Sequence, residues 1–339
     1  MIRPNHISKR HFVYSLVLVV LIVMSAFAGN AQDKAAWMKQ AQWGVMNHYL
    51  ADWIARVEKM EMSVDKWNNL IDNFDVEGLA KQIESVKAGY YLITIGQNSG
   101  FYLSPNSTYD KYVGIQPSKC SQRDLVADLY EALYKRGVKL MVYLPSGAPN
   151  GDRVAARALQ WQRGAYRNRE FQLKWEAVVQ EWSVRWGEKV AGWWFDGCYW
   201  PNSMYRCSEP PNFGSFAAAA RGGNPAGVVT FNPGVVPRIL SLTPHEDYTA
   251  GEINDLDRVE IKRAVDGKID GVQVHILSFL GKRWGMGSPR FSKEQVVKWS
   301  QDIRSKSGVI TDVPIQSNGL ISQPFMDQLT AVGKALGGR

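Results

Sequence analysis

One carboxylate ends a short apolar run in this chain of 339 residues, and its position favours chemistry. Residues 190–197 read VAGWWFDG, and a run so rich in aromatic residues predicts a buried strand. Desolvating an ionised carboxylate is costly unless another group compensates for it, and the C-terminal ends of strands carry the chemistry of parallel α/β barrels. Asp196 is therefore a candidate catalytic residue, although an Asp-Gly pair is also common in plain turns.

Polar and aromatic side chains follow other apolar runs at comparable positions. The polar ones are His48, Asn98, Asn232 and Asp312. Nine aromatic residues are expected near the same strand ends: Trp43, Tyr49, Trp53, Phe101, Tyr102, Trp193, Trp200, Tyr248 and Trp284. Rings there either stack on the C–H faces of sugars or fill the core. The chain contains 13 Trp, more than core packing usually needs, which favours a carbohydrate cleft.

The elements that must position these side chains alternate regularly. Eight strand-like runs begin after residue 33: 43–50, 88–96, 138–145, 190–197, 227–233, 246–252, 271–279 and 308–315. Helical spacing of apolar residues separates most of them: 76–87, 123–136, 170–186, 293–305 and 324–336. Ser121 is the expected N-cap of the second helix. This alternation predicts a parallel α/β sheet, and eight units fit a single-domain (β/α)8 TIM-like barrel. A doubly wound open sheet is the alternative, and the fifth and sixth units are the weakest.

The first 31 residues have a different character. Three basic residues precede the apolar run 12–28, and small residues follow it, which is typical of a secretory signal peptide. We therefore expect a signal peptide over 1–31, a barrel domain over 32–339, and a secreted or periplasmic protein. An uncleaved membrane anchor is the alternative, because the run lies near the lower length limit of about 17 residues for a spanning helix.

Charge and the scarcity of metal ligands narrow the class of protein. Removing the three basic residues of segment 1–31 takes the formal net charge from +8 to +5. The remaining basic residues are scattered, which argues against a nucleic-acid partner and leaves an acidic polysaccharide compatible. Three histidines follow residue 31, without zinc-site spacing: His48, His245 and His275. We expect no metal and no cofactor. Cys198 and Cys207 could close a short disulfide loop, or all the cysteines could be free thiols.

Several segments, in order along nearly all of residues 32–339, resemble the motifs of one enzyme family. Residues 43–49 read WGVMNHY, similar to W/F-G-[IL]-F-I-H-W-G, and residues 89–96 resemble the second strand of the same family. Residues 194–197 read WFDG, similar to W-[FL]-D-G, and residues 247–252 read DYTAGE, similar to D-Y-x-T-P-E. Residues 306–319 resemble its last strand. The family is that of the α-L-fucosidases, glycoside hydrolase family 29.

The resemblance implies a retaining glycosidase that acts on fucosyl or related glycosides of an oligosaccharide or glycan, and the expected signal peptide makes it an exported one. In such an enzyme Asp196 is the nucleophile and Glu252 the general acid and base. Glu246, on the same expected strand, is the rival acid, and a helix N-terminal carboxylate is the alternative role for Glu252. The expected substrate contacts are His48, Asn98, Tyr143, Trp194 and Trp284. His275 lies inside an apolar run, where a structural and a functional role are equally compatible.

The chain departs from the family at one important place. Where the family has His-His-Asp, this sequence has Gln97-Asn98-Ser99, so the donors and acceptors around the sugar differ. Both L-fucose and a related sugar are therefore open as the substrate, and we expect a divergent member without the C-terminal β-sandwich of many relatives. The alternative is a carbohydrate-binding relative that has lost catalysis.

Overall fold

The computed structural model describes residues 33–164, 166–199, 204–236, 238–258, 264–305 and 308–337. The chain divides into two compact units, Met1–Lys34 and Ala35–Arg339, and the second is the unit described below. The expected signal peptide over 1–31 lies outside the described residues. Within the described ranges, no helix has the length and apolar character that crossing a membrane requires.

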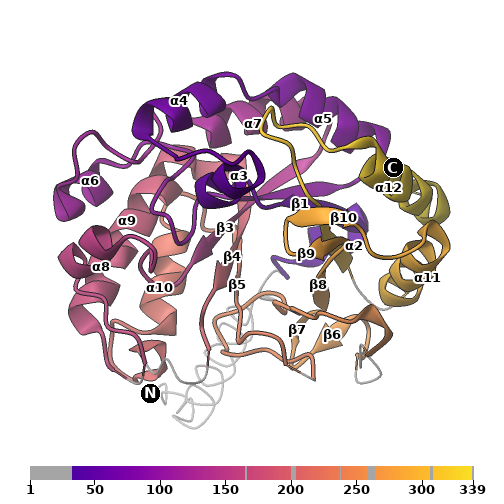
Figure 1. Cartoon of the computed structure of the whole chain (residues 1–339). Coiled ribbons are helices and arrows are strands. Elements are labelled where there is room, and N and C mark those ends of the chain that lie inside the picture. Colours follow the sequence, from indigo (N-terminus) through magenta and orange to yellow (C-terminus); the bar gives the residue numbers. More distant parts are fainter. Residues whose placement is uncertain are drawn as a thin grey trace, which may run out of the picture. The chain divides into compact units, whose positions relative to one another are not determined.

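Seven parallel strands form one curved sheet, with helices around its outside (Figure 1). In spatial order the strands are β5 (Val228–Phe231), β4 (Val190–Asp196), β3 (Lys139–Pro145), β2 (Tyr90–Thr94), β1 (Trp43–Asn47), β11 (Gly308–Asp312) and β8 (His275–Phe279). Two short antiparallel pairs lie beside it: β6 (Lys268–Ile269) with β7 (Val272–Gln273), and β9 (Gly281–Arg283) with β10 (Met286–Pro289).

Residues 246–253 fill the gap between β5 and β8. On one side, the Asp247 amide donates to the Val229 carbonyl at 2.9 Å. On the other side, the segment forms parallel bridges to β8 and to the short strand before it, including Glu252 with Leu277. Gly251 has a φ of +63°, and a Cβ there would overlap the backbone of His275, so this pairing requires glycine. The fold is the expected TIM-like α/β barrel, with an irregular sixth strand.

Eleven α-helices lie within the described residues. They are α2 (Ala36–Ala41), α3 (Ala51–Val57), α4 (Val64–Asp72), α5 (Val76–Ser85), α6 (Ser107–Val113), α7 (Leu125–Tyr134), α8 (Arg153–Ala158), α9 (Arg169–Trp186), α10 (Phe213–Ala220), α11 (Lys293–Arg304) and α12 (Gln323–Leu336). The five expected helices are α5, α7, α9, α11 and α12. Helix α7 is capped by Asp124, whose side chain accepts a bond from Ala127 N, so the expectation of Ser121 as N-cap was wrong.

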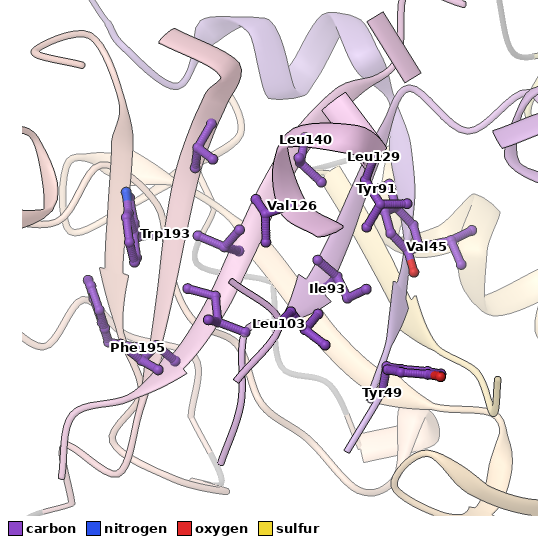
Figure 2. Close-up of a cluster of buried hydrophobic side chains, with 14 of the residues drawn as sticks. Val45, Tyr49, Tyr91, Ile93, Leu103, Val126, Leu129, Leu140, Trp193 and Phe195 are labelled. Atoms are coloured by element: carbon purple, nitrogen blue, oxygen red, sulfur yellow. The ribbon is translucent and has the colours of Figure 1, made fainter. Parts of the chain in front are cut away.

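The strands bury both faces, which explains why they read as continuous apolar runs. Outward residues pack against the helices, and Figure 2 shows Ile93, Trp193 and Phe195 in this layer with Val126 and Leu129 of α7. Inward residues form a second cluster inside the barrel, including Met46, Leu92, Met141, Tyr143, Trp194 and Leu277. Because side chains alternate along a strand, the inward series fixes which residues reach the barrel mouth.

Packing corrects the expectation for the aromatic residues, and the state of the cysteines decides between the two alternatives given for them. Six of the nine aromatic residues expected near the strand ends are buried in the core: Trp43, Tyr49, Phe101, Tyr102, Trp193 and Tyr248. Their rings are therefore part of the packing and do not line a carbohydrate cleft. Trp200 lies outside the described residues. Cys120, Cys198 and Cys207 are all free thiols, so the short disulfide loop does not form.

Candidate active site

Polar residues continue the inward series of side chains at the C-terminal end of the barrel. Asp196 comes two residues after Trp194 on β4, and Glu252 comes two residues after Ala250 on the irregular strand. Tyr143, Asn232, His48 and Asp312 occupy equivalent positions on or just after β3, β5, β1 and β11. The period of two therefore gathers side chains that are far apart in the sequence.

Asp196 accepts hydrogen bonds at both carboxylate oxygens. Tyr143 donates its hydroxyl to Oδ2 at 2.6 Å. Oδ1 accepts from the Gly197 amide at 2.7 Å and from the Asn232 side chain at 2.8 Å, and Tyr199 donates its hydroxyl to it at 3.3 Å. All four partners are donors, which suits a carboxylate because it only accepts. The carboxylate is held in one orientation at the end of β4.

Asn232 joins the two candidate catalytic carboxylates. Its Nδ2 lies 2.8 Å from Asp196 Oδ1 and 2.5 Å from Glu252 Oε2, so these two oxygens are at most about 5.3 Å apart. The Gly234 amide donates to the Asn232 Oδ1 at 3.0 Å, which fixes the orientation of the amide. Retaining glycosidases have carboxylates about 5–5.5 Å apart, whereas inverting enzymes separate them by about 6.5–9.5 Å. The upper limit of about 5.3 Å is therefore shorter than the separation in an inverting pair and compatible with a retaining pair.

Glu252 has the environment of a general acid. Burial, and secondarily the negative charge of Asp196, raise its pKa to about 7, although the bond from Asn232 and the nearby His48 lower it. A carboxyl with such a pKa carries a proton for much of the time at neutral pH, which is the requirement for protonating a leaving group.

Glu246, the rival acid, is held away from this chemistry. Its Oε1 accepts from Thr230 and from the Phe231 amide, at 3.0 and 2.7 Å. Its Oε2 accepts from the Ser241 hydroxyl and the Leu242 amide, at 2.8 and 2.5 Å. Burial raises the pKa of Glu246 to about 7 as well, so the pKa does not distinguish the two glutamates. Geometry does, because the bonds of Glu246 tie the 241–242 backbone to β5.

His48 is another expected site residue at the mouth. Its Nδ1 lies 2.8 Å from Asp312 Oδ1, and the Gly285 amide donates to the other oxygen of Asp312 at 2.5 Å. The His48 ring stacks on Trp53, with centroids 5.0 Å apart, and meets the edge of Trp284 at 6.0 Å. With Nδ1 bound to Asp312, Nε2 is the ring nitrogen that remains for a ligand.

A cavity of about 360 Å³ lies beside His48 and Trp53. The residues of β10, of the chain after β11 and of α12 complete its mainly apolar lining, including Met286, Pro314 and Phe325.

The other expected contacts occupy different depths. Trp194 is 2% exposed, stacks beneath Tyr143 with centroids 5.2 Å apart, and donates its indole N–H to the Ala250 carbonyl. It supports Tyr143 from inside the barrel, and a direct contact with substrate stays a prediction. Asn98 is exposed and donates to Gln97, which in turn donates to the Tyr143 hydroxyl at 2.7 Å. The Gln97-Asn98 departure from the family pattern thus lies directly against the residue that holds Asp196.

A second cavity, of about 420 Å³, opens from Asp196 toward the loops after β2, β3 and β4. Gln97, Asn98, Asn150, Trp161, Arg163 and Tyr199 are among its lining residues. Trp161, Arg163 and Tyr199 were missed in the sequence because they lie on loops, where no period marks the side chains that point inward.

His275 is enclosed in the barrel, where burial lowers its pKa to about 4, and it takes no part in this mouth. Among the residues that the structure describes, no group of three or more His, Cys, Asp or Glu side chains is placed to hold a metal ion.

Comparisons with known proteins identify the fold. No family model and no curated protein matches the chain. An endo-fucoidan hydrolase from glycoside hydrolase family 107 aligns with a TM-score of 0.67 at 16% identity, over 90% of this chain and 93% of that one. The α-L-fucosidase AlfC from Lactobacillus casei, in complex with α-L-fucose product, aligns at 0.62 and 16%, over 90% and 99%. The α-L-fucosidase isoenzyme 1 from Paenibacillus thiaminolyticus aligns at 0.63 and 19%, over 89% and 74%.

These identities show a shared fold, that of TIM-like barrel glycosidases. The similar structures include α-L-fucosidases, which have the activity of the family that the sequence motifs resemble. No sequence match assigns the chain to that family.

Proposed function

We propose that this chain is an exported retaining glycoside hydrolase that acts on fucosyl or related glycosides. The observation that carries the proposal is the pair Asp196 and Glu252, joined by one amide, with their nearest bridged oxygens at most about 5.3 Å apart. One carboxyl is oriented by four donors and the other has a pKa of about 7. These are the two different environments that a double-displacement mechanism needs.

In the first step, Asp196 attacks the anomeric carbon as a carboxylate. The bond from that carbon to the leaving oxygen breaks, and Glu252 gives its proton to this oxygen. The product is a glycosyl ester of Asp196, and Glu252 is left ionised beside it.

In the second step, ionised Glu252 takes a proton from water as the water oxygen attacks the same carbon. The ester bond breaks, the sugar leaves with its configuration retained, and Asp196 is a carboxylate again. Tyr143 and Asn232 hold Asp196 throughout, since both donate to it. Their hydroxyl and amide preorganise the nucleophile for each attack.

The sugar proposed is fucose or a close relative. The support is the resemblance of the motifs to family 29 and the presence of fucose-acting enzymes among the similar structures, whose names state that activity. The segment Gln97-Asn98 sets a different pattern of donors around the glycone, so we expect preferences that differ from those of the family. Export is proposed from the sequence of residues 1–31 alone.

The decisive experiment is a screen of aryl α- and β-glycosides, including L-fucosides and L- and D-galactosides. Wild type should release the aryl group from at least one α-L-glycoside, and Asp196→Ala should not. Azide should restore turnover to Asp196→Ala by replacing the missing nucleophile, and the product should have inverted configuration. Hydrolysis that survives Asp196→Ala would refute the nucleophile assignment. Binding of glycans without turnover of any glycoside would favour the alternative, a carbohydrate-binding relative without activity.

A further inference from the structure

We propose that the 420 Å³ cavity beside Asp196 is a subsite for a second sugar unit that carries an anionic group, on the glycone side of the scissile bond. We call it the glycone-side cleft. Its defining residues are Trp161, Arg163, Tyr199 and Asn150. The inference rests on the proposed function, because the assignment of its side uses Asp196 and Glu252 as nucleophile and acid.

The order of the strands around the barrel indicates on which side of the scissile bond the cleft lies. The cleft is lined by residues after β2, β3 and β4, whereas Glu252 lies on the irregular strand beyond β5. The leaving group departs toward Glu252, since this residue protonates its oxygen. A cavity that touches Asp196 from the opposite direction therefore receives the part of the glycan that stays on the enzyme.

The walls of the cleft are built for a sugar ring. Trp161 is partly exposed, and its indole N–H donates to Asn150 Oδ1 at 2.8 Å. Phe171 packs edge-to-face against Trp161, with centroids 4.7 Å apart, and Gly147 leaves room for the ring, because a Cβ there would lie 3.0 Å from it. Tyr199 is 41% exposed and forms part of the lining beside Asp196. The cleft thus offers a fixed aromatic wall with amides nearby.

The charge of the cleft lining indicates which substituent the bound sugar carries. Arg163 is the cation among the residues that line the cleft, and none of the ion pairs between described residues includes it. An arginine presents a planar fork of donors that matches the oxygens of a carboxylate or an oxyanion ester. An unpaired guanidinium beside an aromatic wall therefore fits a sugar that carries a sulfate ester or a uronic acid carboxylate.

Binding to an inactive enzyme tests the cleft separately from the reaction. The full chain with Asp196→Ala would be titrated calorimetrically with sulfated fuco-oligosaccharides, with their desulfated counterparts, and with oligosaccharides containing glucuronic acid. Adding Arg163→Ala should weaken binding of one anionic ligand class about tenfold and leave the neutral ligand unchanged. The loss should shrink as salt is added. The matched control is Arg157→Ala, an exposed arginine of α8 outside the cleft lining, which should change neither.

Each outcome has a meaning. A selective loss for the sulfated or the uronic ligand supports the proposal and names the substituent. Equal losses for neutral and anionic ligands, no loss for either anionic class, or the same loss in Arg157→Ala would overturn it. Failure of wild type to hydrolyse any glycoside would refute the proposed function, and a selective Arg163 effect on binding would then remain measurable.

Discussion

Asn232→Ala should remove the amide that bridges the two carboxyls and so change the pH dependence of the reaction. The Asn232 amide donates to Glu252 at 2.5 Å and so favours its ionised form. Without it, the pKa of Glu252 should rise above its value of about 7. Glu252 must be protonated to act as the acid, so kcat/KM falls as the pH rises through its pKa. The alkaline limb of the profile should therefore move to higher pH in the variant.

The size of the shift follows from the bond that is lost. Hydrogen bonds to charged groups contribute about 1.5–3 kcal/mol, and about 1.36 kcal/mol corresponds to one pH unit, so the limb should move by about one to two units. The same amide also holds Asp196, and losing that bond should lower kcat/KM on the acid side of the limb by about 10- to 100-fold.

The assay is the pH profile of kcat/KM for an aryl glycoside that wild type hydrolyses. Glu246→Gln is the matched control, because burial also raises the pKa of Glu246 to about 7, while its hydrogen bonds to the Phe231 and Leu242 amides hold its carboxyl away from Asp196. The control should keep the wild-type limb. A limb that stays in place in Asn232→Ala, or disappears in Glu246→Gln, would refute the reasoning.

Three further variants test the site. Glu252→Gln should abolish hydrolysis and should stabilise the fold above pH 7 by on the order of 3 kcal/mol. The pKa of Glu252 is about 7 in the folded protein and 4.5 in the unfolded chain, so wild type loses stability as the pH rises from 4.5 to 7, whereas the variant does not. Urea unfolding of both proteins at pH 5 and pH 8 checks this, and no gain in the variant at pH 8 would contradict it. Gly285→Ala should lower the melting temperature and raise KM, since a Cβ there would lie 2.5 Å from the Trp53 ring. The control is Gly271→Ala, which also has a positive φ but has no atom within 4 Å of the added Cβ, so its effect on both measurements should be smaller. Tyr143→Phe removes a 2.6 Å bond to Asp196 and should cost about 10- to 100-fold in kcat, more than Tyr199→Phe, whose hydroxyl lies at 3.3 Å; equal rates for the two would contradict the assignment.

Strand periodicity made the barrel and the position of Asp196 at its mouth predictable from the sequence. The eight expected runs correspond to the seven strands of the sheet and the irregular sixth strand, because parallel strands buried on both faces leave a long apolar signal. Asp196 was found because it ends such a run. The role of Asn232 was not, since an amide that bridges two carboxylates from different strands leaves no local pattern.

Aromatic residues misled the sequence interpretation for a related reason. Trp193 and Trp194 are neighbours in the chain, but one packs outward against the helix layer and the other inward beneath Tyr143. A count of aromatic residues makes both of them candidates for lining a cleft, whereas the alternation of side chains along the strand places them on opposite faces of the sheet. The aromatic wall of the glycone-side cleft comes instead from a loop residue, Trp161.

Because the sixth strand is irregular, the segment that carries Glu252 is attached to the barrel more loosely than the strand that carries Asp196. Asp196 ends β4, which pairs along its length with β3 and β5, whereas Glu252 is held by an isolated bridge and single backbone bonds. Changes of length or sequence in residues 246–253 would therefore reposition Glu252, the proposed proton donor, without rebuilding the strand that holds Asp196, the proposed nucleophile. A library directed at this segment is a direct route to new linkage preferences, with Gly251 left unchanged because a Cβ there would overlap the backbone of His275.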